Sequence, residues 1–182
     1  MRIDVSETIE TDLVEAAWHT YLAAFEELRI KAVHRQVMYR HEFDEMNADR
    51  KVLKYLGWDD AGQLRAVASA TKHLHAMPLI SPEYFEHRWP KLYAERRIWY
   101  WWFAAVHPDA RGTGIFEHLV AAMFGTAADD RGVVALDMCR RNADEVGLAA
   151  HMDSLLGRLS GSVRTERMDE ESYWLFEFPA MA

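Results

Sequence analysis

The sequence predicts an α/β protein in which a mixed β-sheet is flanked by helices. The main observation is a pair of apolar runs, residues 98–106 and 133–139, which are typical of strands buried on both faces. A helical pattern lies between these runs, and a strand–helix–strand unit makes the two strands parallel. Other segments alternate as antiparallel strands do, so we expect a mixed sheet. A chain of 182 residues with this composition is expected to form one domain, residues 1–182.

Composition and charge exclude several classes of protein. With 21 Lys+Arg, 29 Asp+Glu and a net charge of −8, the chain offers no basic surface for nucleic acid. Its longest apolar run, Ile98–Val106, is far shorter than the roughly 20 residues of a membrane-spanning helix. Cys139 is the only cysteine, so we expect no disulfide within the chain and no metal site built from several cysteines, and we predict no metal-binding residues. The first residues turn acidic where a secretion signal is apolar, and we therefore expect a cytoplasmic protein.

The first half of the chain predicts two helices and a hairpin. Apolar residues recur at helical spacing from Val14 to Leu28, and Thr11 suits the N-cap of that helix. The predicted elements are, in order, a short strand at 2–5, helices at 14–28 and 33–46, strands at 51–58 and 64–71 joined by a turn at 59–62, and short helical pieces within 78–97.

The second half predicts the crossover unit and a closing hairpin. Five consecutive aromatic residues within Ile98–Val106 leave no polar face, so this strand is expected to be central and covered on both sides. Beyond it, the predicted elements are a helix over 115–126, a strand at 133–139, a helix over 143–159, and a hairpin of residues 162–167 and 172–178 in which Trp174, Phe176 and Phe178 share one face.

The loop between the first buried strand and its helix is the most informative stretch of the sequence. Two glycines, Gly112 and Gly114, allow the backbone to approach a ligand without an intervening Cβ. The first amides of the following helix have no acceptor within the helix and carry a partial positive charge, so they can bind a diphosphate. Arg111 adds a permanent cation. The alternative is that the glycines only permit a tight connection between strand and helix.

This stretch resembles the acyl-CoA motif of the GNAT N-acetyltransferase superfamily. The motif V-x-P-x-x-R-G-x-G-I is spelled here by Val106, Pro108, Arg111, Gly112, Gly114 and Ile115. The order of elements along the chain is similar to that fold as well. The resemblance implies about seven strands, in which the two central parallel strands, 98–106 and 133–139, splay apart. It also implies that acetyl-CoA or another acyl-CoA is the acyl donor.

The resemblance also assigns residues to the donor site. The pantetheine arm would hydrogen-bond the backbone of the first splayed strand, at Phe103, Ala104, Ala105 and Val106. The amides of Gly112, Thr113, Gly114, Ile115 and Phe116 would cradle the diphosphate. Asn142 resembles an asparagine that often follows the second splayed strand.

Three positions depart from the pattern of that family. Phe116 stands where members commonly have Gly or Ala, and its ring could change how CoA is seated. Trp102 stands where many members carry a glutamate base, and Ala149 stands where a tyrosine acid is frequent. The sequence therefore supports cofactor binding better than it supports a set of catalytic side chains.

Asp137 is the residue that we predict to act as general base. It is the only charge in the run 133–139, and burying a carboxylate is costly unless a partner or a task justifies it. The alternative is that Asp137 pairs with Arg140 or Arg141 at the end of the strand.

The predicted function is acyl transfer from CoA to the amine of a small molecule, by direct attack in a ternary complex. One alternative is a catalytically silent acyl-CoA-binding or regulatory protein with the same fold. A second is a dinucleotide-binding enzyme, although Glu117 replaces the third glycine of that fingerprint and five residues separate Val106 from Gly112. The aromatic content leaves room for a homodimer interface.

Overall fold

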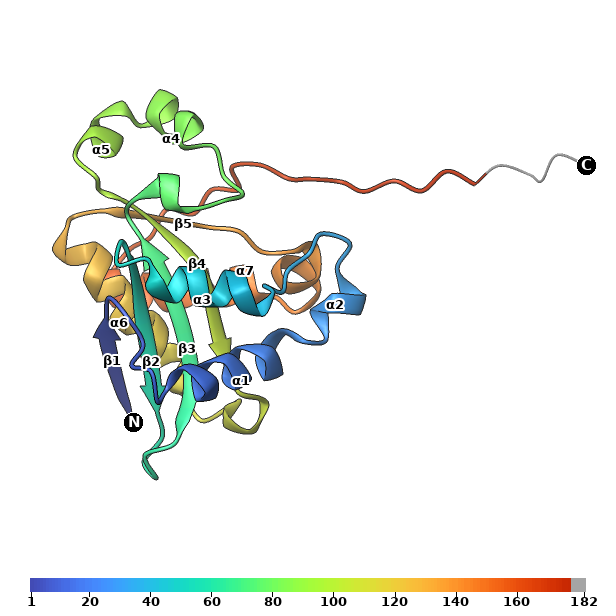
Figure 1. The fold of residues 1–182 in the computed structure, drawn as a ribbon. Coiled ribbons are helices and arrows are strands. Elements are labelled where there is room, and N and C mark those ends of the chain that lie inside the picture. The colour runs from blue at the N-terminus through green and yellow to red at the C-terminus, as the bar shows by residue number, and fades with distance from the viewer. Residues whose placement is uncertain (178–182) are drawn as a thin grey trace, which may run out of the picture.

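The computed structural model describes residues 1–177 and contains one five-stranded mixed sheet (Figure 1). The strands lie side by side in chain order: β1 (Arg2–Ser6), β2 (Val52–Trp58), β3 (Leu64–Thr71), β4 (Ile98–Val106) and β5 (Val133–Leu136). The first four run antiparallel to their neighbours, whereas β4 and β5 are parallel. The α/β class, the hairpin of β2 and β3, and the parallel crossover are therefore confirmed.

Helices cover both faces of the sheet. In order they are α1 (Val14–Phe25), α2 (Leu28–Lys31), α3 (Arg40–Ala48), α4 (Pro82–Arg88), α5 (Pro90–Ala94), α6 (Ile115–Asp129) and α7 (Leu148–Ser160). Helices α1 and α3 lie on one face, α6 and α7 lie on the other, and α4 and α5 cap one end (Figure 1). No helix among the described residues is long and apolar enough to cross a membrane.

Each face of the sheet has its own apolar core. On the first face, Tyr21 of α1, Phe43 of α3 and Val67 of β3 are fully buried together. On the second face, Leu119 and Met123 of α6 are buried over β2, β3 and β4, beneath α7. The alanines at alternate positions of β3 face α6 and let that helix approach closely.

Three helix boundaries differ from those predicted. Residues 11–13 form a turn before α1, so Thr11 is not its N-cap. The helix predicted over 33–46 begins only at Arg40, where the Tyr39 amide donates to the Glu42 carboxylate across 2.6 Å. The helix predicted over 143–159 is divided, because Gly147 has a φ of +76° and cannot continue a right-handed helix. A π-helical turn, Arg141–Glu145, precedes it.

The strand count differs from the seven predicted. β5 ends at Leu136 rather than at residue 139, and residues 162–177 contain no strand, while Phe178 lies outside the described residues. The first residues of this C-terminal segment are hydrogen-bonded to helices instead. Thr165 donates to Asp153 of α7 across 2.5 Å, and Arg167 donates to Asp144 of the π-helical turn across 2.6 Å. Residues 162–177 pair with no strand of the sheet, and a two-stranded hairpin has little stability of its own. β5 is therefore an edge strand in the described part of the chain.

Candidate functional site

The parallel strands β4 and β5 pair over only four positions and then separate. The register runs from Ile98 opposite Val133 to Trp101 opposite Leu136. β4 continues to Val106 without a partner on this side among the described residues. The predicted splay of the two strands is thus present, and it begins directly after Trp101.

A β-bulge at Trp102 marks the same point on the opposite edge of β4. Ala70 of β3 faces Trp101 and Ser69 faces Phe103, so Trp102 is an extra residue in β4. An extra residue reverses the alternation of side chains, and Trp102 and Phe103 therefore both lie on the α1 face of the sheet. The Phe103 ring packs edge-on against Tyr21 of α1, with ring centroids 4.9 Å apart. This ring belongs to the core.

Beyond the bulge, the backbone of β4 presents polar groups to its open side. The His107 amide donates to the Arg65 carbonyl across 2.8 Å, so this opposite pair is a hydrogen-bonded one. Hydrogen-bonded pairs alternate along an antiparallel ladder, and Phe103 and Ala105 therefore face β3. The N–H and C=O groups of Ala104 and Val106 point to the open side. Of the four residues predicted to bind a pantetheine arm, these two have free backbone groups.

The loop after β4 turns sharply into α6. His107 Nδ1 accepts from the Asp109 amide across 3.3 Å, and a 3-10 turn of Pro108–Ala110 follows. Gly112 and Gly114 have φ values of +76° and +88°, which disfavour any residue with a Cβ. A Cβ at either position would meet no atom within 4 Å. Both glycines are therefore set by the turn itself, and the space in front of them is open.

Five backbone amides at the start of α6 have no acceptor among residues 1–177. They belong to Gly112, Gly114, Ile115, Phe116 and Glu117; the first bond into the helix is from the His118 amide to the Gly114 carbonyl, across 3.2 Å. The Thr113 amide is used within the loop, donating to the Ala110 carbonyl across 3.3 Å. Thr113 was predicted among the donors and Glu117 was not. This set of donors, at the positive end of a 15-residue helix, can bind an anion such as a diphosphate.

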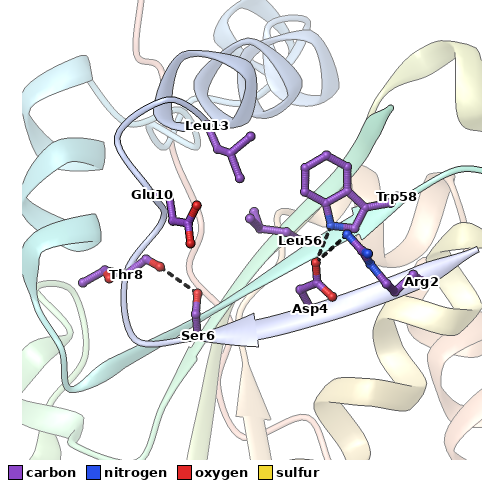
Figure 2. A pocket seen from close by; sticks show the side chains of 8 residues that line it. All are labelled: Arg2, Asp4, Ser6, Thr8, Glu10, Leu13, Leu56 and Trp58. Atoms are coloured by element: carbon purple, nitrogen blue, oxygen red, sulfur yellow. Dashed lines mark hydrogen bonds and ion pairs between the residues drawn. The ribbon is translucent and has the colours of Figure 1, made fainter. Parts of the chain in front are cut away.

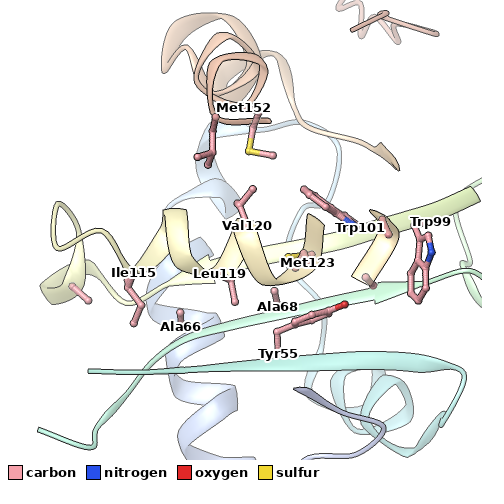
Figure 3. Packing of buried hydrophobic residues seen from close by; sticks show 14 residues of the cluster. Tyr55, Ala66, Ala68, Trp99, Trp101, Ile115, Leu119, Val120, Met123 and Met152 are labelled. Carbon is pink, nitrogen blue, oxygen red and sulfur yellow. The ribbon is translucent and has the colours of Figure 1, made fainter. Parts of the chain in front are cut away.

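The start of α6 is fixed to the sheet by Ile115. Its side chain is 1% exposed and reaches Gly57 of β2, where a Cβ would lie 3.4 Å from Ile115 Cδ1 and 2.8 Å from Ala66 Cβ. Figure 3 shows Ile115 and Leu119 directed from α6 onto the strands. The five free amides are therefore held by packing that leaves little room for movement.

The remaining predicted donor-site residues lie around this turn. Phe116 is directed to α7, with its ring centroid 5.8 Å from that of His151. Arg111 is exposed and forms no ion pair within the described residues. Asn142 is half-buried in the π-helical turn that follows β5.

Asp137 lies just past the end of β5 and is exposed, which corrects the prediction of a buried carboxylate. The Tyr100 hydroxyl of β4 donates to Asp137 Oδ1 across 2.7 Å. Arg140 and Arg141 pair instead with Glu145, at 3.4 and 3.6 Å, so the alternative of an Asp137–arginine pair is wrong. Burial, and secondarily the negative charge of Asp137, raises the pKa of the Tyr100 hydroxyl. Tyr100 therefore remains a protonated donor to the carboxylate.

Two surface hollows lie away from this site. The larger, about 480 Å³, is lined by β1, β2 and the segment after β1, and Figure 2 shows Asp4 at its base, accepting from Trp58 Nε1 across 2.8 Å. The smaller, about 200 Å³, lies at residues 28–39. Neither contains the open side of β4 or the amides of α6.

Comparison with solved structures decides the fold. No family model and no curated protein matches the sequence. A probable acetyltransferase matches over 98% of this chain and 100% of its own, with a TM-score of 0.61 and 14% identity. The aminoglycoside acetyltransferase meta-AAC0020, from an uncultured soil metagenomic sample, matches over 96% of both chains, with a TM-score of 0.55 and 12% identity. The ribosomal-protein-S18-alanine N-acetyltransferase from Escherichia coli matches over 83% of this chain and 76% of its own, with a TM-score of 0.53 and 18% identity.

The chain has the GNAT acetyltransferase fold. The resemblance inferred from the residues around Gly112 is thereby confirmed at the level of fold. Identities of 12 to 18% establish a shared architecture rather than a shared substrate. This chain has split parallel strands, a bulge in β4 and a glycine turn before α6, and it has no strand within residues 162–177.

Sequence reasoning missed three features of the site. It did not predict Tyr100 as the partner of Asp137, the Glu117 amide as a free donor, or the bulge at Trp102. The motif spacing could have indicated the Glu117 amide, since the first amides of any helix lack acceptors. Nothing in an uninterrupted aromatic run indicates which residue is the bulge.

Proposed function

We propose that this protein transfers an acetyl or other acyl group from CoA to the amine of a small molecule. The observation that carries the proposal is that two sets of unpaired backbone groups follow one another along the chain. The free amides of α6 follow the free backbone groups of Ala104 and Val106 along one stretch of chain. A diphosphate and a peptide-like arm require these two kinds of partner in this order.

The residues at this site fit an acyl-CoA as the acyl donor. The amides of Gly112, Gly114 and Ile115 to Glu117 would hold the diphosphate, with the exposed Arg111 adding positive charge. Ala104 and Val106 would bind the pantetheine arm as an added strand would. Phe116, directed to α7, leaves the turn free. When bound, acyl-CoA would supply an acyl group already activated as a thioester.

Asp137 is the group that we assign to remove a proton from the amine. An amine in water is protonated, and a base must accept its proton before nitrogen can attack a carbonyl carbon. Asp137 is exposed at the end of β5, where the strands separate, and Tyr100 fixes its orientation from the neighbouring strand. Holding the two reactants together contributes several kcal/mol, so a modest base suffices.

A small-molecule acceptor is supported by the comparison with meta-AAC0020, an aminoglycoside acetyltransferase. The negative net charge of this chain, −8, favours the approach of a cationic amine over long range. A cytoplasmic location and a homodimer stay predictions; light scattering of the purified protein tests the second.

The dinucleotide-binding alternative conflicts with the topology. Such enzymes have a doubly wound, mostly parallel sheet, whereas here only β4 and β5 are parallel. The silent acyl-CoA-binding protein remains a distinct alternative, because it would share the donor site and lack turnover.

The test is release of free thiol from acetyl-CoA in the presence of a panel of primary amines. Accumulation of thiol together with the acetylated amine supports the proposal. Binding of acetyl-CoA by calorimetry, with no thiol release on any amine, would favour the silent binding protein. No binding of acetyl-CoA contradicts both.

A further inference from the structure

Two buried polar side-chain atoms lack a hydrogen-bond partner among residues 1–177. They are the indole Nε1 of Trp101 and the hydroxyl of Ser69. Buried donors are almost always paired, because an unpaired one loses its bonds to water without replacement. Both atoms flank the bulge: Trp101 precedes the extra residue of β4, and Ser69 pairs with the residue after it.

Trp101 differs in this respect from two other tryptophans of the sheet. Trp99, which precedes it on the same face of β4, donates from Nε1 to Asp130 Oδ2 across 3.2 Å. Trp58 of β2 donates to Asp4 Oδ2 across 2.8 Å. The Trp101 side chain is 4% exposed, so water does not reach it freely. Its indole N–H is a donor that the fold buries without using.

The position of Trp101 relates this donor to the proposed site. It occupies the last position at which β4 pairs with β5, so its Cα lies at the point where the two strands separate. Figure 3 shows the ring projecting from β4 toward α6 and α7, on the face that carries the free amides of α6. The Ser69 hydroxyl lies on the opposite face, in the fully buried core beneath α1.

A ligand that follows the free backbone groups ends beside Trp101. Residues 102–106 extend about 16 Å at about 3.3 Å per strand residue, a length comparable with an extended pantetheine arm. With a diphosphate at α6 and an arm along Val106 and Ala104, the acyl end reaches the bulge. The carbonyl oxygens at that end are acceptors that need a donor once they leave water.

We propose that the Trp101 indole N–H donates a hydrogen bond to a carbonyl oxygen at the acyl end of the bound donor. This inference rests on the proposed function and assigns Trp101 as a binding residue of the same site. The acceptor is either the thioester carbonyl or the nearest amide carbonyl of the arm. Acetyl-CoA has both carbonyl oxygens, whereas CoA has only the amide carbonyl oxygen. Comparing the binding of these two ligands therefore shows which oxygen is the acceptor.

Trp101→Phe removes the N–H and keeps an aromatic ring. We expect it to weaken acetyl-CoA binding about 3- to 10-fold by calorimetry, the range for one hydrogen bond. If the thioester carbonyl is the acceptor, CoA binds Trp101→Phe as it binds the unmodified protein. If the amide carbonyl is the acceptor, both ligands weaken equally. Ser69→Ala, which removes the other unpaired atom, is the matched control and should bind both ligands normally.

A second measurement uses the unmodified protein. In a ¹H–¹⁵N spectrum, the Trp101 indole signal, assigned by its absence from Trp101→Phe, should move downfield on addition of acetyl-CoA. Normal binding by Trp101→Phe together with an unmoved indole signal overturns the inference. The proposed function survives that result if the unmodified protein still binds acetyl-CoA. If the unmodified protein does not bind acetyl-CoA, the inference and the proposed function both fail.

Discussion

The Tyr100 hydroxyl donates to Asp137 Oδ1 across 2.7 Å. This hydrogen bond joins β4, before it separates from β5, to the residue that follows β5. Burial keeps the hydroxyl protonated by raising its pKa. Asp137 is exposed, just past the end of β5. The pair therefore has one fixed donor and one carboxylate open to a substrate.

Asp137→Asn is expected to lower kcat about 100-fold with little change in KM for acetyl-CoA, because a general base contributes at least that factor. Tyr100→Phe should have a smaller effect, since it leaves the carboxylate in place and removes only its orientation. The double variant should be no slower than Asp137→Asn, because the two groups act as a unit. Steady-state kinetics on an accepted amine measure all three, and an unchanged kcat in Asp137→Asn rules out this base.

Gly57→Ala should destabilise the protein by about 1–3 kcal/mol, the usual cost of overpacking a core. The new Cβ would lie 2.8 Å from Ala66 Cβ and 3.2 Å from Ile3 Cδ1. Gly125→Ala, in the middle of α6 with open space around it, should instead stabilise by about 0.5–1 kcal/mol. Urea denaturation of both variants measures the two signs, and equal effects would refute the close packing at Gly57.

Stability is expected to fall as the pH drops below about 6.5, the usual value for histidine, in part because of His73. Burial, and then the charges of Arg96 and Lys51, lower the pKa of His73. Its depressed pKa means that the unfolded chain binds the proton more readily, so acid favours unfolding. The loss of stability between pH 7.5 and 5.5 should be smaller in His73→Gln. Denaturant midpoints at the two pH values measure it, and identical losses would exclude a role for His73.

Most of the sheet could be predicted from local patterns. The run Ile98–Val106 is apolar on both faces, and the strand it predicts is covered by helices on both sides, with matching boundaries. The glycine turn was also predictable, because positive φ values such as those of Gly112 and Gly114 favour a residue without a Cβ.

The features that depend on distant contacts could not be predicted. The C-terminal segment alternates as a strand does, yet Trp174 is 79% exposed and no strand pairs with it among the described residues. Pairing there depends on neighbours that no local pattern reveals. Asp137 was expected to be buried because it lies within the apolar run 133–139, but β5 ends one residue before it. The bulge at Trp102 depends on the register with β3 and leaves no mark in the sequence.

The central claim is that the free amides at the start of α6 bind the diphosphate of an acyl-CoA. Gly112→Asp places a side chain and a negative charge in front of these amides, at a position with a φ of +76°. Gly62→Asp is a matched control, since Gly62 has a φ of +75°, open space around it and a place in the turn between β2 and β3. The two variants therefore add the same charge at positions with nearly the same φ.

Calorimetric titration with acetyl-CoA is the most direct measurement. We expect Gly112→Asp to bind at least about 10-fold more weakly than the unmodified protein, about 1.4 kcal/mol, and Gly62→Asp to bind normally. Equal affinity of a folded Gly112→Asp variant and the unmodified protein would contradict the account.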